Sequence, residues 1–305
     1  PSTISTSDLA TGISSSTSNY SWTAEADLQY DKTIATDHHL EALLGYSAQK
    51  FNQESNSISG TDYPNDAVPW LDAATSITDG KSNTENYSLL SAFGRLNYNY
   101  KGKYLVSAAM RRDGSSRFGE NKKYGNFPSL SLGWMLSDEP FMKRFGFLDM
   151  LKIRASYGLT GNNNIGNYTY IPNIGTYNYI FNGTLVPGAT ISTLGNSDLA
   201  WERNKQFDIG LDLSLWGGRI SFTYDYYHKI TDGMIQARPI PRASGFSTIT
   251  TNIGAFEFWG HEFSLSTVNL TGRLKWNSSF NISFDRNLVK SLLSPGFIRR
   301  NNTVT

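Results

Sequence analysis

Residues 18–30 read SNYSWTAEADLQY, and apolar and polar side chains alternate along this stretch almost without interruption. One set of alternate positions is apolar or aromatic: Tyr20, Trp22, Ala24, Ala26, Leu28 and Tyr30. The other set is polar or charged: Asn19, Ser21, Thr23, Glu25, Asp27 and Gln29. A period of two predicts a β-strand with one apolar face and one wet face. The fold depends on whether the apolar face contacts a protein core or lipid.

The same alternation recurs along the chain and predicts about ten strands in all. The other predicted strands span residues 39–50, 87–100, 103–112, 127–137, 151–160, 205–216, 219–230, 257–268 and 273–286. Helical periodicity is nearly absent, and only residues 139–147 have a pattern that fits about one helical turn. The sequence therefore predicts an all-β fold, built as an antiparallel up-and-down meander.

Composition narrows the classes of function. The chain has 305 residues, a formal net charge of +1 and no cysteine. A near-neutral charge gives no field that would gather nucleic acid, and the lack of cysteine excludes disulfides and thiolate metal sites. No apolar run reaches the roughly 18 residues of a spanning helix, and residues 1–20 lack the regions of a signal peptide. Neither a membrane-spanning helix nor a signal peptide is therefore expected.

Long and short connections alternate along most of the predicted meander. The longest lie around residues 51–86, 161–200 and 231–253, and the tightest are Lys101-Gly102-Lys103 and Gly217-Gly218. Alternate connections of a meander emerge at the same end of the sheet. Outer-membrane barrels have this asymmetry, with short periplasmic turns and long external loops. We therefore expect the long connections outside the cell and the tight turns in the periplasm.

Strand length and aromatic placement favour lipid over a protein core. Predicted strands such as 87–100 exceed the five or six residues typical of sandwich strands and suffice for a tilted membrane crossing of about 9–11 residues. Aromatic residues gather at strand ends, as in the girdles of membrane barrels: Tyr20, Trp22, Tyr30, Tyr98, Tyr100, Tyr104 and Trp216. The apolar faces are predicted to contact lipid and the polar faces a water-filled lumen. A soluble all-β protein is the alternative.

Charged side chains of both signs fall on the predicted inner faces: Glu25, Asp27, Arg95, Lys152, Arg154, Asp208, Asp212, Asp225, Lys229, Lys275 and Asp285. Two interpretations stay open. The charges could form a path for substrate, or they could pair with one another or with a plug inside the barrel, since charges are common in such lumens.

Four blocks of sequence are more specific than the alternation. They are RRDGSSRFGENKKYGNFPSLSLGWMLSDEPFM (111–142), LKIRASYGLTGNN (151–163), LAWERNKQFDIGLDLSLWGGRISFTYDYYHKITDGMI (199–235) and NIGAFEFWGHEFSLS (252–266). In this order they resemble the SusC/RagA family of TonB-dependent outer-membrane transporters of Bacteroidetes. The resemblance extends over residues 18–290. Ala200 and Phe258 depart from it, because polar residues are expected at their positions.

The resemblance implies a transmembrane β-barrel of about 22 strands, closed by an N-terminal plug that carries a TonB-contacting segment. It also implies a SusD-like surface lipoprotein that acts as a lid. Residues 1–305 are accordingly expected to form one partial barrel domain, without the plug, the TonB-contacting segment, a signal peptide or the terminal strand. Such a portion would have two open sheet edges, expected at residues 20–30 and 274–286.

The function implied by the resemblance is TonB-dependent import of a bulky nutrient, an oligosaccharide or a peptide, through the outer membrane. The alternative is a passive porin or a structural barrel. An outer-membrane protease would need a histidine beside carboxylates on the lumen side. Strand parity instead places His228 with Tyr224 and Tyr226 toward lipid, and His261 with Phe263. Neither enzymatic activity, catalytic residues nor a cofactor is expected.

Aromatic side chains in the long connections are the candidate substrate contacts: Tyr63, Trp70, Tyr177, Tyr179 and Phe181. They could stack on sugar rings or peptide side chains, or they could pack the loops against each other or against a lid. His38-His39 could begin a metal site, but no third ligand follows at a useful spacing, so no metal site is expected.

Overall fold

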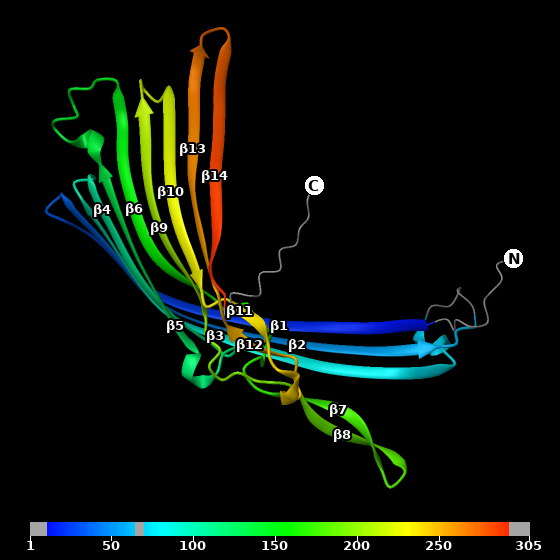
Figure 1. Cartoon of the computed structure of the whole chain (residues 1–305). Helices are drawn as coiled ribbons and strands as arrows, with labels where there is room; N and C mark the ends of the chain where they lie inside the picture. Colours follow the sequence, from blue (N-terminus) through cyan, green and yellow to red (C-terminus); the bar gives the residue numbers. More distant parts are fainter. Residues whose placement is uncertain (1–10, 65–69, 293–305) are drawn as a thin grey trace. The chain divides into compact units, whose positions relative to one another are not determined.

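The computed structural model describes residues 11–64 and 70–292, and ten long strands form its main sheet. The strand order is β1-β2-β3-β4-β5-β6-β9-β10-β13-β14 (Figure 1). The strands are β1 (Thr11–Ile34), β2 (His38–Thr61), β3 (Ser76–Tyr100), β4 (Tyr104–Ser115), β5 (Tyr124–Met135), β6 (Leu148–Asn162), β9 (Glu202–Leu215), β10 (Ile220–Asp232), β13 (Ala255–Thr271) and β14 (Lys275–Ser291). The predicted all-β antiparallel meander is confirmed.

Two of the long connections contain hairpins of their own. β7 (Asn173–Phe181) pairs with β8 (Thr184–Thr193), and β11 (Ile235–Pro239) pairs with β12 (Thr248–Asn252). The turn between β7 and β8 is Asn182-Gly183, with φ values of 50° and 76°. A two-residue turn of this kind needs positive φ at both positions, which Asn and Gly tolerate best.

Helical structure is limited to four short 3-10 helices in the described residues: η1 (Leu71–Ala73), η2 (Glu120–Lys122), η3 (Leu136–Asp138) and η4 (Arg242–Ser244). Within the same residues, no helix is long and apolar enough to cross a membrane.

The described residues form two compact units, and the first consists of residues 11–24, 48–64 and 70–89. A single long loop was predicted over residues 51–86, and this prediction is wrong, because β2 continues to Thr61 and β3 begins at Ser76. Residues 76–85 are all exposed. When both faces of a strand contact water, no apolar alternation marks it in the sequence, although its backbone ladder continues.

The second unit consists of residues 25–47 and 90–292, and its sheet has one polar and one apolar face. Three strands illustrate the register. Asp208 of β9 pairs with Ser156 of β6 and Tyr227 of β10, whereas the adjacent Ile209 pairs with Ala155 and Tyr226. Because the pleat sends neighbouring side chains to opposite faces, this register sorts the whole second unit into two chemically different surfaces.

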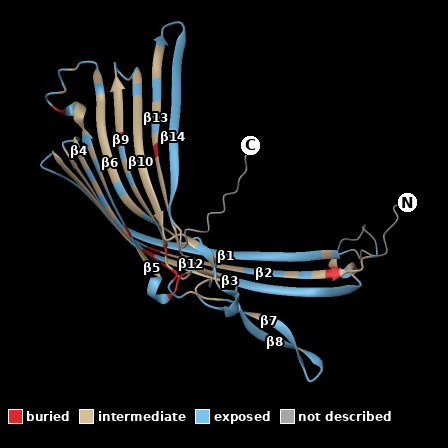
Figure 2. Ribbon diagram, in the orientation of Figure 1, coloured by how far each residue is buried: buried red, intermediate tan, exposed pale blue. Residues whose placement is uncertain are grey.

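The apolar face carries large side chains that no other layer of the described residues covers. Leu130 and Leu132 of β5 remain 48% and 49% exposed, and Trp134 on the same face is 37% exposed. Buried apolar side chains are few in the described residues (Figure 2). They lie near the strand ends that carry the long connections, rather than beneath the sheet: Phe118, Phe127, Leu199 and Trp201.

β1 and β14 are the two edges of the sheet. They stand at opposite ends of the strand order, and both are exposed along nearly their whole length (Figure 2). Within the described ranges no ladder joins one to the other. The prediction of an open sheet with edges at residues 20–30 and 274–286 is therefore confirmed.

Tight turns and long connections of the second unit lie at opposite ends of its strands. The tight turns are residues 35–37, 101–103, 216–219 and 272–274, and the long connections are 163–201 and 233–254. Lys101 and Gly102 have φ values of 57° and 70°, so Gly102 supplies a left-handed position that other residues adopt less readily. The connection 136–147 belongs to the tight-turn end, because Phe147 accepts a hydrogen bond from the backbone N–H of Trp216, at 2.9 Å.

Candidate functional site

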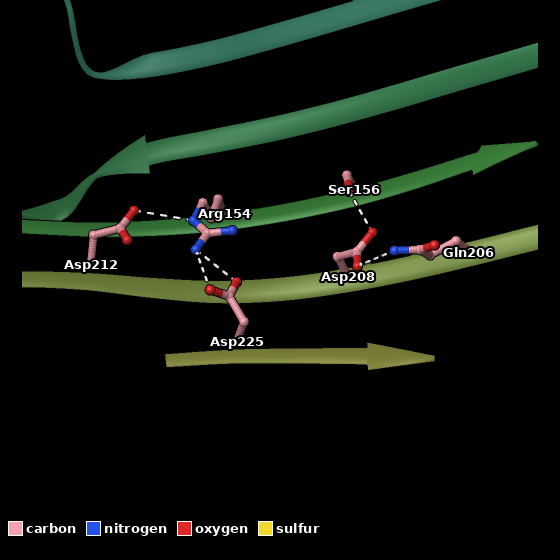
Figure 3. A network of polar contacts seen from close by, with 6 residues as sticks. All are labelled: Arg154, Ser156, Gln206, Asp208, Asp212 and Asp225. Carbon is pink, nitrogen blue, oxygen red and sulfur yellow. Dashed lines mark hydrogen bonds and ion pairs between the residues drawn. The ribbon is translucent and has the colours of Figure 1, made fainter. Parts of the chain in front are cut away.

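The centre of the polar face carries an ion-pair network on three adjacent strands (Figure 3). Nε of Arg154 on β6 lies 3.1 Å from Oδ2 of Asp212 on β9. Its Nη2 lies 2.7 Å from Oδ1 of Asp225 on β10. One guanidinium thus joins the carboxylates of two other strands and neutralises charge that would otherwise face an open surface.

Gly210 makes room for this network. It pairs with Arg154 on one side and with Asp225 on the other, so the guanidinium crosses directly above it. A Cβ atom at this position would lie 2.5 Å from Cζ of Arg154 and 2.6 Å from Oδ1 of Asp225. Glycine is therefore the residue that allows side chains from the two flanking strands to meet over the middle one.

The polar face continues on both sides of the network. Asp208 accepts hydrogen bonds from Ser156 at 3.1 Å and from Gln206 at 2.8 Å (Figure 3). Farther along the sheet, the hydroxyl of Tyr227 donates to Oδ1 of Asp285 at 2.8 Å. A shallow hollow of about 420 Å³ on this face is lined by residues of β2 to β6 and β9, including Arg154 and Asp208.

Several predicted inner charges therefore pair with other residues of this chain. Asp212 and Asp225 pair with Arg154, and Nζ of Lys229 lies 5.0 Å from the ring centroid of Phe258. The last contact also explains the departure at Phe258, because an aromatic ring on a polar face is favourable beside a cation. For these residues, the structure therefore favours mutual pairing of the inner charges over a path of unpaired charges for substrate.

A small buried cluster fixes the strand ends that carry the long connections. The ring centroid of Trp201 lies 5.1 Å from that of Phe118 and 5.4 Å from that of Phe127, and Nε1 of Trp201 donates to the backbone oxygen of Lys123 at 3.0 Å. Leu199 is also fully buried. The cluster thus connects residues of the 111–142 and 199–235 blocks, a role that strand periodicity alone does not predict.

Ala200 is held by hydrogen bonds of its backbone, so no polar side chain is needed at this position to fix the connection. Its N–H donates to Oδ1 of Asn252 at 2.7 Å, and its carbonyl accepts from Nδ2 of the same residue at 2.7 Å. Asn252 also donates to the carbonyl of Gly233 at 2.8 Å. One asparagine therefore ties together the connections on either side of β9 and β10.

The structure brings three of the five predicted contact residues together. Tyr177, Tyr179 and Phe181 occupy alternate positions of β7, are 59%, 52% and 66% exposed, and so form an aromatic row on one face of the β7–β8 hairpin. Tyr63 and Trp70 belong to the first compact unit. The ring of Tyr63 lies over Gly12, whereas Trp70 is 71% exposed.

Aromatic rings also gather on the apolar face at the tight-turn end. The ring centroid of Tyr104 lies 6.1 Å from that of Tyr100 and 6.4 Å from that of Trp134. Glu139, in the connection after β5, accepts hydrogen bonds from the hydroxyl of Tyr104 at 2.7 Å and from Nε1 of Trp134 at 3.2 Å. These hydrogen bonds, with Lys103 nearby, hold the pKa of Glu139 below its ordinary value.

His228 has a carboxylate partner that parity reasoning overlooked. Its Nε2 lies 2.6 Å from Oε1 of Glu257. The pair lies on the apolar face, where His228 is on the same side of β10 as Tyr226 and Tyr224, as predicted. An outer-membrane protease would need its histidine–carboxylate pair on the lumen side, and this pair lies on the opposite, apolar face.

Comparison with known proteins assigns the chain to a family. The model of the TonB dependent receptor-like β-barrel family matches residues 2–302. A TonB-dependent receptor of Formosa agariphila is 39% identical over 276 residues, which are 90% of this chain and 26% of that protein. The TonB-dependent receptor SusC of Bacteroides thetaiotaomicron is 32% identical over 277 residues, 87% of this chain and 27% of SusC.

Solved structures give the same result for the fold. The RagAB peptide transporter superposes with a TM-score of 0.84 at 27% identity, covering 92% of this chain and 31% of the matched chain. The outer-membrane transporter YddB of Escherichia coli, at 13% identity and a TM-score of 0.57, shares the fold.

The chain spans about a quarter of the length of the curated relatives it matches. The family match and the shared fold exclude a soluble all-β protein. The family comprises receptors of the outer membrane rather than enzymes. This chain therefore belongs to the TonB dependent receptor-like β-barrel family and forms part of a SusC/RagA-type outer-membrane barrel.

Proposed function

We propose that residues 1–305 are a partial barrel domain of a longer importer, which uses TonB to move a bulky nutrient through the outer membrane. The observation that carries the proposal is the two-faced sheet of the second unit. Its apolar face suits lipid, and its polar face, with Arg154 paired to Asp212 and Asp225, suits the wall of an aqueous lumen. The nutrient we propose is an oligosaccharide or a peptide.

The proposed partners follow from the same membership. A SusD-like surface lipoprotein closes the barrel from outside, and the TonB complex acts on a segment in the N-terminal part of the longer protein. The aromatic row Tyr177, Tyr179 and Phe181, together with Trp70, offers exposed rings to a sugar, a peptide or the lipoprotein, and the half-buried Tyr63 is a further candidate contact.

The test uses the intact protein in its native host. Uptake of fluorescent maltodextrins and fluorescent peptides is measured in three strains: wild type, a gene deletion, and a variant of the intact protein without its TonB-contacting segment. We expect the deletion strain and the segment-less variant to lose uptake of one substrate class, while immunoblots show normal amounts of the variant in the outer membrane. Full uptake by the segment-less variant would instead identify a passive porin.

The same assay tests the aromatic row. Combined replacement of Tyr177, Tyr179 and Phe181 by alanine should reduce uptake or lipoprotein co-purification, because exposed rings supply contact area at an interface. The control is Asn178→Ala, on the opposite face of the same strand. Equal loss in both variants would mean that the hairpin fold, not the row of rings, is responsible.

A further inference from the structure

A histidine and two carboxylates converge near the first tight turn of the second unit. Asp31 lies on β1, and His39 and Glu41 lie on β2, on the other side of the turn at residues 35–37. Nε2 of His39 lies 3.1 Å from Oε1 of Glu41 and 3.7 Å from Oδ2 of Asp31. Residue spacing alone does not reveal this third ligand, because Asp31 approaches His39 only through the pairing of β1 with β2 across the turn.

Hydrogen bonds from outside the cluster orient two of its three members. Nδ1 of His39 lies 3.2 Å from Oγ1 of Thr33, and Oε2 of Glu41 accepts from Nδ2 of Asn97 at 3.0 Å. Asn97 is itself fixed by Ser107, whose hydroxyl donates to its Oδ1 at 2.7 Å. Metal-ligating histidines and carboxylates characteristically have such outer partners, which set the tautomer and the direction of each donor atom.

One tautomer of His39 prepares the cluster for a cation. When Nδ1–H of His39 donates to Thr33, the lone pair of Nε2 points toward the carboxylate oxygens of Glu41 and Asp31, and a metal ion between these atoms would bind all three. In the other tautomer, Nε2–H donates to Glu41 and the hydroxyl of Thr33 donates to Nδ1, so no ion is needed.

The dimensions suit a metal. Zinc bonds of about 2.0–2.2 Å in a tetrahedron place neighbouring donor atoms about 3.3 Å apart. The two separations from Nε2, 3.1 and 3.7 Å, bracket that value, and all three donor atoms lie within 4.8 Å of one another.

We propose that Asp31, His39 and Glu41 bind a divalent transition-metal ion of the zinc class on the polar wall of the barrel. The imidazole selects such an ion over Mg²⁺ and Ca²⁺, which prefer oxygen ligands alone. Three protein ligands leave a fourth position for water or for a group from the lumen. Bound metal joins β1 to β2 beside the tight turn.

Zinc titration of the intact protein tests the site. The purified, EDTA-treated protein is titrated with Zn²⁺ by calorimetry, in excess Mg²⁺, as wild type and as His39→Ala. We expect the wild type to bind one Zn²⁺ more than the variant. Thr33→Val keeps all three ligands but removes the orienting hydroxyl, and should weaken this one site by about 10- to 100-fold.

His38→Ala is the matched control, because His38 is the adjacent residue and its Nδ1 lies 2.7 Å from the hydroxyl of Tyr98 rather than near Asp31. It should retain the wild-type stoichiometry. Heat-modified migration on gels verifies folding, and Glu41→Gln replaces His39→Ala if that variant does not fold. Identical zinc binding by wild type and His39→Ala, or no zinc signal at these residues in anomalous diffraction, would show that His39 only hydrogen-bonds to its neighbours and would overturn the proposal.

Discussion

A methyl group at position 210 would occupy the space through which the guanidinium of Arg154 reaches Asp225, with separations of 2.5 Å from Cζ and 2.6 Å from Oδ1. Gly210→Ala should therefore push the guanidinium aside and separate it from its partners. For a partly exposed network we expect a loss of about 1 kcal/mol in the free energy of unfolding. Urea titration of the intact protein in lipid vesicles measures this loss.

Two controls separate the network from the general effect of removing a glycine. In an Arg154→Ala background the guanidinium is gone and the carboxylate of Asp225, no longer held by it, can move aside. Gly210→Ala should then be neutral or stabilising by about 0.4–1 kcal/mol, through restriction of the unfolded chain. Gly80→Ala, on β3 with open space around it, should behave in the same way. Equal losses in both backgrounds would mean that Arg154 and Gly210 are not coupled.

Single residues also show what a local sequence pattern can predict: the face on which a side chain lies, but not its partner. Parity placed Arg154, Asp212 and Asp225 on one face, because the direction of a side chain depends only on the pleat. Their pairing depends on the register of three strands, which no local pattern records. Asp31 and His39 meet for the same reason, across a hairpin whose exact alignment the sequence leaves open.

At the scale of a strand, β9 has an apolar face, which should contact lipid, and a polar face, which should contact water. Leu211 pairs with Ile153 and Tyr224 on the apolar face. Leu211→Arg should cost about 2–4 kcal/mol if the site lies near the membrane midplane, and about 0–1 kcal/mol near an interface. Folding into bilayers, followed against urea, gives the value.

Thr223→Arg provides the comparison at nearly the same depth, because Thr223 pairs with Asp212, the neighbour of Leu211. It faces the polar side, next to carboxylates, and should change stability little. If the two arginine variants were equally destabilised, the apolar face would not be the lipid-facing one.

Elements were predictable wherever one face is apolar and the other polar. All ten strands of the main sheet were anticipated on this basis, but the outer part of β3 was not, since residues 76–85 contact water on both sides. The β7–β8 hairpin was also missed, although Asn182-Gly183 between β-forming segments is a strong turn signal. Buried loop residues such as Phe118 and Trp201 have no periodic pattern, so only tertiary contacts reveal them.

At the scale of the whole chain, the tight turns and the long connections should lie on opposite sides of the membrane. The sequence contains no cysteine, so single introduced cysteines can report on each side. Thr184→Cys lies in the β7–β8 hairpin, and Gly146→Cys lies in the connection 136–147, where added atoms meet open space. An impermeant thiol reagent on intact cells should label position 184 and spare position 146. The opposite labelling would reverse the orientation.

The β7–β8 hairpin also bears on how the sheet assembles. Most neighbouring strands of the main sheet are joined by short connections, so their contacts are local and should form quickly. The pairing of β6 with β9 closes the longest of the sheet's connections, because residues 163–201 must first be looped out. A hairpin that closes early within that segment shortens the free loop, and each halving of loop length lowers the entropic cost by about 0.6 kcal/mol. Its Asn-Gly turn thus lowers the entropic cost of the longest loop closure in the sheet.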